Sequence, residues 1–163
     1  MKRFLQSGVV IFAGVLGIAT ASGQPEQDVS KDRKKFDFRE AVLRKFFKNN
    51  HCPIEDFAGT FLAEADLNGL DWRLLPSISL VESGGGRTAK GNNLFGWANG
   101  KQTFNNMSEA IHLVASALSH GRSYVGKDLR GKLAAFNHAI DYQLMVLNIM
   151  QQISPTEQVQ ATE

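Results

Sequence analysis

Residues 77–100 read SISLVESGGGRTAKGNNLFGWANG, in which an apolar helical segment runs directly into a loop rich in glycine and asparagine. Three consecutive glycines, Gly84–Gly86, are expected to end the helix. Glu82 then lies in its last turn, between apolar residues and the loop. A helix C-terminus disfavours an anion and apolar neighbours displace water, so both effects raise a carboxyl pKa. The pattern indicates an acid that stays protonated near neutral pH; the alternative is a solvated surface glutamate.

The second half of this stretch has the pattern of a small hairpin. Two short apolar runs, Leu94–Ala98 and Thr103-Phe104, flank the dipeptide Asn99-Gly100. Asn-Gly between apolar runs is the strongest short-range signal for a two-residue β-turn. We therefore predict a small β-hairpin lobe after the third helix.

The remainder of the chain has apolar residues at helical spacing, which predicts a mostly α fold. Gly69 is expected to end the second helix in left-handed backbone. The predicted helices cover Phe38–Asn49, Asp56–Asn68, a segment that Asp71 would cap, a segment that Ser108 would cap and that runs to about Ser119, Asp128–Phe136 and Asp141–Ile153.

The charge of the chain is concentrated at its N-terminus. The 163 residues include 18 basic and 16 acidic side chains, and Lys2 and Arg3 account for the whole surplus. The remaining 16 basic residues balance the 16 acidic ones, so a strongly basic nucleic-acid binder is excluded. The composition, 43% hydrophobic and 21% charged, is that of a globular protein.

The first 21 residues are predicted to be a cleaved secretory signal peptide. A positive end is followed by an apolar run and by Ala19-Thr20-Ala21, the small-residue pattern of a cleavage site. The run of 13 residues from Val9 to Ala21 is short of the ~20 that span a bilayer, although an uncleaved membrane anchor is the alternative. We expect export to the periplasm or the cell exterior, a flexible leader over 22–36, a disordered tail over 154–163 and no stable membrane span after cleavage.

No cofactor or metal is predicted. The single cysteine, Cys52, cannot form an internal disulfide and is interpreted as a structural residue in an inter-helix turn. The histidines lack metal-ligand spacing, and the glycines at 84–86 lack the Lys-Ser/Thr of a phosphate loop.

Four motifs occur in a specific order: GLDWRLLP at 69–76, VESG at 81–84, NNLFGW at 92–97 and FNNMSEAI at 104–111. Together they resemble the lysozyme-like superfamily, specifically bacterial lytic transglycosylases and the related peptidoglycan glucosaminidase-type domains, which include mannosyl-glycoprotein endo-beta-N-acetylglucosaminidase-like domains. The resemblance implies a lysozyme-like helical domain over 37–153 with a cleft for peptidoglycan glycan strands. It also implies that Glu82 protonates the leaving glycosidic oxygen, the role of the raised-pKa glutamate in lysozyme.

The position of a second carboxylate separates the possible reactions. Glycosidases with two carboxylates place them about 5–9.5 Å apart. From Ser83 to Ser108 the sequence has no acidic residue, and the next acid is Glu109. This favours the single-acid chemistry of the transglycosylases that the chain resembles, in which a muramoyl hydroxyl replaces water and yields a 1,6-anhydro end. The alternatives are a hydrolytic β-N-acetylglucosaminidase using Glu64 or Asp66, and a non-catalytic glycan-binding module.

Candidate substrate-binding residues surround Glu82 in the sequence. Asparagine amides can orient an N-acetyl group, a serine hydroxyl can bond the acid or the sugar, and aromatic rings can stack on sugars; the alternatives are turn formation and core packing. Related enzymes have a Tyr-Asn pair where this chain has Phe136-Asn137, which leaves Tyr142 to supply a hydroxyl. The candidates are Ser83, Asn92, Asn93, Phe95, Trp97 and Tyr142.

Overall fold

The computed structural model describes residues 36–155. The predicted signal peptide at 1–21 lies outside the described residues. So do the predicted leader, except for Phe36, and the predicted tail, except for Ser154 and Pro155.

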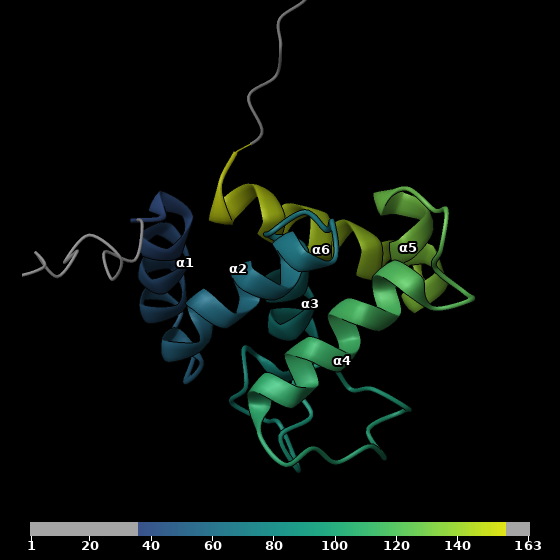
Figure 1. Cartoon of the computed structure of the whole chain (residues 1–163), viewed down its shortest axis with the longest axis horizontal. Coiled ribbons are helices and arrows are strands. Elements are labelled where there is room, and N and C mark those ends of the chain that lie inside the picture. The colour runs from purple at the N-terminus through teal and green to yellow at the C-terminus, as the bar shows by residue number, and fades with distance from the viewer. Residues whose placement is uncertain (1–35, 156–163) are drawn as a thin grey trace, which may run out of the picture. The chain divides into compact units, whose positions relative to one another are not determined.

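The described part of the chain is mostly helical, as predicted (Figure 1). Its elements agree closely with the expected segments, and the first helix and the ends of the last two coincide with the prediction. None of these helices is both long enough and apolar enough to cross a bilayer, within the residues that the structure describes. The elements are α1 (Phe38–Asn49), the 3-10 turn η2 (Glu55–Phe57), α2 (Ala58–Leu67), α3 (Leu74–Ser83), α4 (Met107–His120), α5 (Leu129–Phe136) and α6 (Ile140–Ile153).

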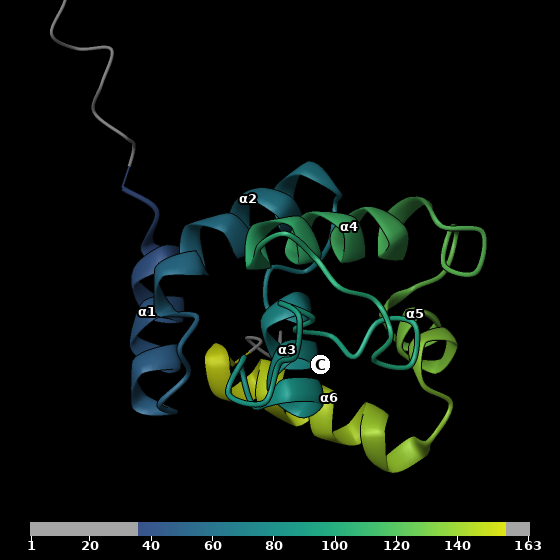
Figure 2. The same ribbon diagram turned by 90° about the horizontal axis from the view of Figure 1, so that it is seen from below.

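The central element is α3, which carries Glu82. Figure 2 shows α2 and α4 on one side of it and α6 on the other, and α3 contacts both α2 and α6. Its residues Leu75, Ile78 and Ser79 are fully buried. Burying a Leu or Ile side chain contributes about 1.5–3 kcal/mol, so α3 is fixed as the core of the helical layers.

A row of phenylalanine rings continues the core from α1 into the loop after α3. The ring centroids of Phe47 and Phe61 are 5.5 Å apart, and those of Phe61 and Phe95 are 6.5 Å apart. Phe95 belongs to the loop and is 1% exposed. The loop is therefore held against the helices by its own buried aromatic residue.

Two helices start at other residues than predicted. Asn106, not Ser108, caps α4: its Oδ1 accepts a hydrogen bond from the Glu109 backbone N–H at 2.9 Å. Asp71 does not cap α3, which begins after Arg73. Asp71 instead accepts hydrogen bonds from the backbone and the guanidinium of Arg73. The same guanidinium donates to the Ser154 carbonyl at 2.7 Å, which ties the end of α6 to the start of α3.

The predicted β-hairpin lobe is not formed. Residues 84–106 consist of turns and irregular backbone. A strand requires negative φ, near −120 to −140°, but Gly96 and Ala98, both inside the predicted first strand, have φ of 59° and 54°. The Asn99-Gly100 turn does occur, with φ of 55° and 74°. Positive φ at three consecutive residues, 98 to 100, coils the chain instead of returning it as a paired strand.

Candidate active site

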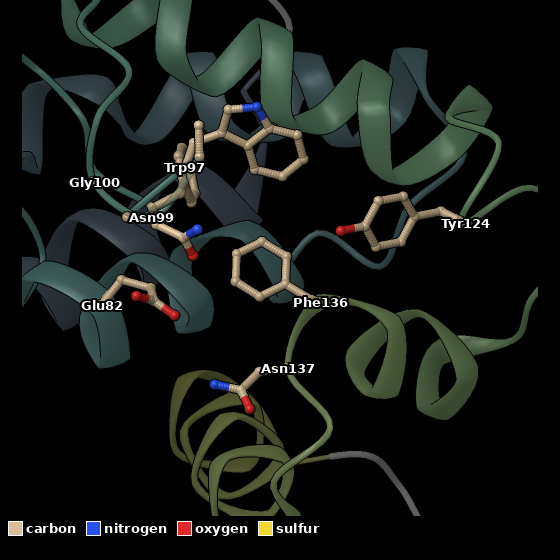
Figure 3. Close-up of a pocket in the computed structure, with 10 residues that line it drawn as sticks. Glu82, Trp97, Asn99, Gly100, Tyr124, Phe136 and Asn137 are labelled. Carbon is tan, nitrogen blue, oxygen red and sulfur yellow. The ribbon is translucent and has the colours of Figure 1, made fainter.

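Glu82 occupies the last turn of α3, as expected, and Gly84 ends the helix in the left-handed conformation at φ 61° and ψ 36°. Figure 3 shows the Glu82 carboxyl group pointing into a cavity. The side chain is half-buried. Burial of the carboxyl group raises the pKa of Glu82 above the 4.5 of a free glutamate, and the Tyr142 hydroxyl opposes part of that increase. No cation among the described residues forms an ion pair with Glu82. The environment therefore favours the protonated acid.

A glycine makes room for this carboxyl group. A Cβ atom on Gly96 would lie 2.6 Å from Oε2 of Glu82, and Gly96 has φ of +59°. A side chain at this position would therefore displace the acid and would also strain the backbone. The NNLFGW motif thus supplies a backbone surface against which the acid packs.

Tyr142, from the first turn of α6, is a polar side chain that interacts with the acid. Its side chain is 6% exposed, and its hydroxyl is the one fully buried side-chain polar atom of residues 36–155 without a partner in hydrogen-bonding geometry. Burial and the charge of Glu82 raise the pKa of the phenol well above its usual value. The Tyr142 ring stacks on Phe136, with centroids 6.0 Å apart and ring planes at 11°. The structure thus brings the two predicted site residues Glu82 and Tyr142 together.

The cavity that Glu82 faces has a volume of about 670 Å³, in the range of ligand pockets. Aromatic rings, amide groups and loop backbone make up the rest of its lining, and Glu82 is the one carboxylate among the lining residues. The side chains of Trp97, Asn99, Tyr124, Phe136 and Asn137 surround the opening in Figure 3.

A smaller cavity of about 140 Å³ lies on another side of Glu82. It shares Glu82, Gly96 and Gly100 with the larger one and adds polar side chains, among them Thr88 and Lys90. Glu82 is again the one carboxylate in the lining. The acid therefore stands where two adjoining spaces meet.

The two alternative acids are engaged elsewhere. Asp66 forms two hydrogen bonds with the Arg39 guanidinium at 2.7 and 2.8 Å. Glu64 lies 3.0 Å from Nδ1 of His112. Neither residue lines either cavity.

Several predicted substrate-binding residues are used by the loop itself. Ser83 donates to the Leu94 carbonyl at 2.8 Å and accepts from the Gly86 N–H at 3.0 Å. The Asn92 amide donates to the Phe104 carbonyl at 2.9 Å. These contacts join the end of α3 to its loop.

Asn93 has the same kind of role in the middle of the loop. Its amide nitrogen donates to the carbonyls of Trp97 and Gln102, both at 3.0 Å, and its oxygen accepts from the Trp97 N–H at 2.9 Å. Both amide hydrogens are therefore occupied. Substrate contacts by Ser83, Asn92 and Asn93 stay predictions.

Phe95 and Trp97 divide between core and cavity. Both line the larger cavity, but Phe95 is almost fully buried whereas Trp97 is half-buried. The Trp97 ring lies 6.0 Å from Phe136. Of these two aromatic residues, Trp97 is therefore the one with exposed surface that a ligand can contact.

Tyr124 is one of several lining residues, with Asn99 and Asn137 among the others, that were not predicted as substrate-binding residues. It belongs to the connection between α4 and α5, and Figure 3 shows its hydroxyl directed into the cavity. The Lys132 ammonium holds this connection by donating to the Leu118 carbonyl at 2.7 Å and to the Tyr124 carbonyl at 3.1 Å. No local motif surrounds Tyr124, so only the helix packing reveals its position.

Cys52 has the structural setting that the sequence indicates. It is 5% exposed in the turn between α1 and η2, and burial raises the pKa of its thiol. A Cβ on Gly85 would lie 2.5 Å from the Cys52 sulfur, so the thiol packs directly against the glycine turn. Within residues 36–155 no cluster of three His, Cys, Asp or Glu side chains is placed to hold a metal ion.

No protein-family model matches this chain, and no curated protein matches it either. The fold and site define a helical protein with one carboxylic acid at the meeting point of two cavities.

Proposed function

We propose that this protein is an exported enzyme that cleaves the glycan strands of peptidoglycan, as a lytic transglycosylase with Glu82 as its single acid and base. One observation carries the proposal: a half-buried carboxyl group faces a cavity of about 670 Å³ lined by aromatic rings, and among residues 36–155 it has no ion-pair partner and no second carboxylate in that lining. Sugars bind through ring stacking and amide hydrogen bonds, and this lining offers both.

Glu82 would act twice in this reaction. As the protonated acid it donates its proton to the glycosidic oxygen, and the C1–O4 bond of the muramoyl residue breaks. As the resulting carboxylate it accepts the proton of the 6-hydroxyl of the same residue, whose oxygen forms the new bond to C1. The acid is regenerated, no water is consumed, and the product carries a 1,6-anhydro ring.

Tyr142 supports the second step. After the first proton transfer Glu82 is an anion, and a hydroxyl within reach stabilises that anion by donating a hydrogen bond. The Tyr142 hydroxyl is buried, interacts with Glu82 and has no competing partner in the described structure. It therefore takes the place of the hydroxyl that Phe136 lacks.

The hydrolytic alternative is less well supported than the transglycosylase. A two-carboxylate hydrolase needs a second carboxyl group within about 9.5 Å of the first. Neither Glu64 nor Asp66 lines a cavity with Glu82, and each has its own cationic or histidine neighbour. A hydrolase would need a different source for its base.

A non-catalytic glycan-binding module is the second candidate. The observation that favours it is Phe136, which lies in the cavity where related enzymes have a tyrosine. The same aromatic lining would then serve binding alone. Glu82 distinguishes the two functions, because a binding module has no use for a desolvated acid.

The test is digestion of purified peptidoglycan followed by mass spectrometry of the products. Wild-type protein should release fragments with 1,6-anhydro ends. Glu82→Gln should reduce the release at least 100-fold, in line with loss of general acid catalysis, while cosedimentation with the cell wall is kept. Glu55→Gln, at a carboxylate that lines neither cavity, is the matched control and should retain activity. Reducing ends without anhydro products would refute the transglycosylase; absence of any release by the wild type would favour the binding module.

The predicted signal peptide at 1–21 agrees with this substrate, because peptidoglycan lies outside the cytoplasmic membrane. We propose a periplasmic or extracellular location. N-terminal anchoring in the membrane is the alternative.

A further inference from the structure

The smaller cavity beside Glu82 has two polar groups that the protein does not use. Its Ser83 and Asn93 side chains are committed to backbone hydrogen bonds. The Thr88 hydroxyl and the Lys90 ammonium, in contrast, form no side-chain hydrogen bond or ion pair with the described residues. The unused groups of this cavity are therefore one neutral donor and one cation.

The charges around Glu82 are distributed unevenly. Of the described residues that line either cavity, Lys90 is the one cation and Glu82 the one anion. The larger cavity offers rings and amides, which suit an uncharged sugar. A ligand that carries a carboxylate finds electrostatic attraction only on the Lys90 side.

The loop fixes the backbone at Lys90, whose side chain is exposed. Its carbonyl accepts from the Asn93 N–H at 3.1 Å, and the next carbonyl, of Gly91, accepts from the Phe104 N–H at 2.9 Å. The cavity volume of about 140 Å³ leaves room for a short acidic substituent.

We infer that the smaller cavity is a carboxylate site, in which Lys90 pairs with, and Thr88 donates a hydrogen bond to, a carboxylate carried by the sugar next to the scissile bond. This inference rests on the proposed function, because it specifies which group of the glycan binds next to Glu82. Peptidoglycan offers the carboxylate in two forms: the lactyl group of a peptide-free muramic acid, and the carboxylates of a stem peptide. A bound carboxylate beside Glu82 also disfavours ionisation of the acid and so keeps it protonated.

Binding to the Glu82→Gln protein, measured by titration calorimetry, tests the inference without cleavage. The three probes are chitotetraose, which has no carboxylate; the N-acetylglucosamine–N-acetylmuramic acid tetrasaccharide with free lactyl groups; and the same tetrasaccharide with stem peptides. We expect at least one carboxylate-bearing probe to bind about two- to fivefold more tightly than chitotetraose, the effect of an exposed ion pair. Lys90→Met should remove this advantage and Lys90→Arg should restore it. Lys45→Met, at an exposed lysine of α1, is the control and should leave it unchanged.

The pattern of the probes identifies the source of the carboxylate. Preference for the peptide-free tetrasaccharide assigns the site to the lactyl group, and preference for the peptide-bearing one assigns it to the stem. Equal affinity for all three probes, no binding of any of them, or an advantage that survives in Lys90→Met would overturn the inference. Failure of the proposed function is seen separately: Lys90-dependent binding by a protein whose wild type releases no anhydro fragments overturns the enzyme but keeps the site.

Discussion

Replacing Gly96 with alanine should move the carboxyl group of Glu82 and lower the activity much more than the free energy of unfolding. The new Cβ would lie 2.6 Å from Oε2 of Glu82, whereas ordinary contact begins near 3.4 Å, so the carboxyl group must move by about 0.8 Å. A misplacement of about 1 Å can cost about 100-fold in rate. We expect kcat for peptidoglycan cleavage to fall roughly 30- to 100-fold.

The stability of Gly96→Ala should change much less than its activity. The clashing atom is the end of a flexible side chain, so the fold can relieve the contact by moving Glu82. What remains is the strain of alanine at φ of +59°, about 1–2 kcal/mol. Gly69→Ala is a closely matched control, with φ of +61° and nothing within 4 Å of its added Cβ.

The two variants are compared by urea denaturation and by release of soluble fragments from purified peptidoglycan. Both should lose a similar free energy of unfolding, but only Gly96→Ala should lose activity. If Gly96→Ala kept full activity at the stability of Gly69→Ala, the packing of the acid against the loop would not be what positions it. Equal loss of activity in both would point to strain instead.

Three further changes test the site and its loop. Tyr142→Phe removes a hydroxyl that opposes the upward shift of the Glu82 pKa, so the alkaline limb of the kcat/KM–pH profile should move to higher pH. A shift to lower pH would contradict the contact. The folded state raises the pKa of Glu82 above its unfolded value of about 4.5, so ionisation of the acid destabilises the fold as the pH rises through the folded pKa. In denaturant titrations Glu82→Gln should therefore be more stable than wild type at pH 7.5 but equal to it below pH 4. Equal stability at both pH values would show that the acid is not desolvated. Asn93→Ala removes three hydrogen bonds to the Trp97 and Gln102 backbone and should lower the free energy of unfolding by about 2–3 kcal/mol. A thermal unfolding midpoint equal to that of wild type would mean that the loop does not depend on this amide.

The helices could be predicted because their information is local. Apolar spacing and stop signals define α1, α5 and α6 almost to the residue. The starts of α3 and α4 differ from the prediction in different ways: α3 begins after Arg73 without a side-chain cap, whereas Asn106 replaces Ser108 as the cap of α4. At α4 the extended backbone of Asn106 lets its side chain reach the Glu109 N–H.

The hairpin prediction failed because turn signals describe a turn and not the pairing around it. Asn99-Gly100 adopts the positive φ that its residues favour. The flanking run, however, contains Gly96 and Ala98, which both have positive φ, and Gly96 also packs against the carboxyl group of Glu82. Positive φ at these two residues is incompatible with an extended strand.

The sequence by itself determined the helical class, the position of Glu82 at a helix end, and the lack of a second acid in the following loop, because each of these depends on residues close together in the chain. Only the tertiary structure decided what surrounds the acid. Tyr124, Phe136 and Tyr142 come from segments 42 to 60 positions beyond it, and helix packing alone sets whether such residues face a cavity or the core. The same packing assigned Ser83 and Asn93 to the loop and left Lys90 beside the acid, because a side chain's hydrogen-bond partners depend on what folds against it.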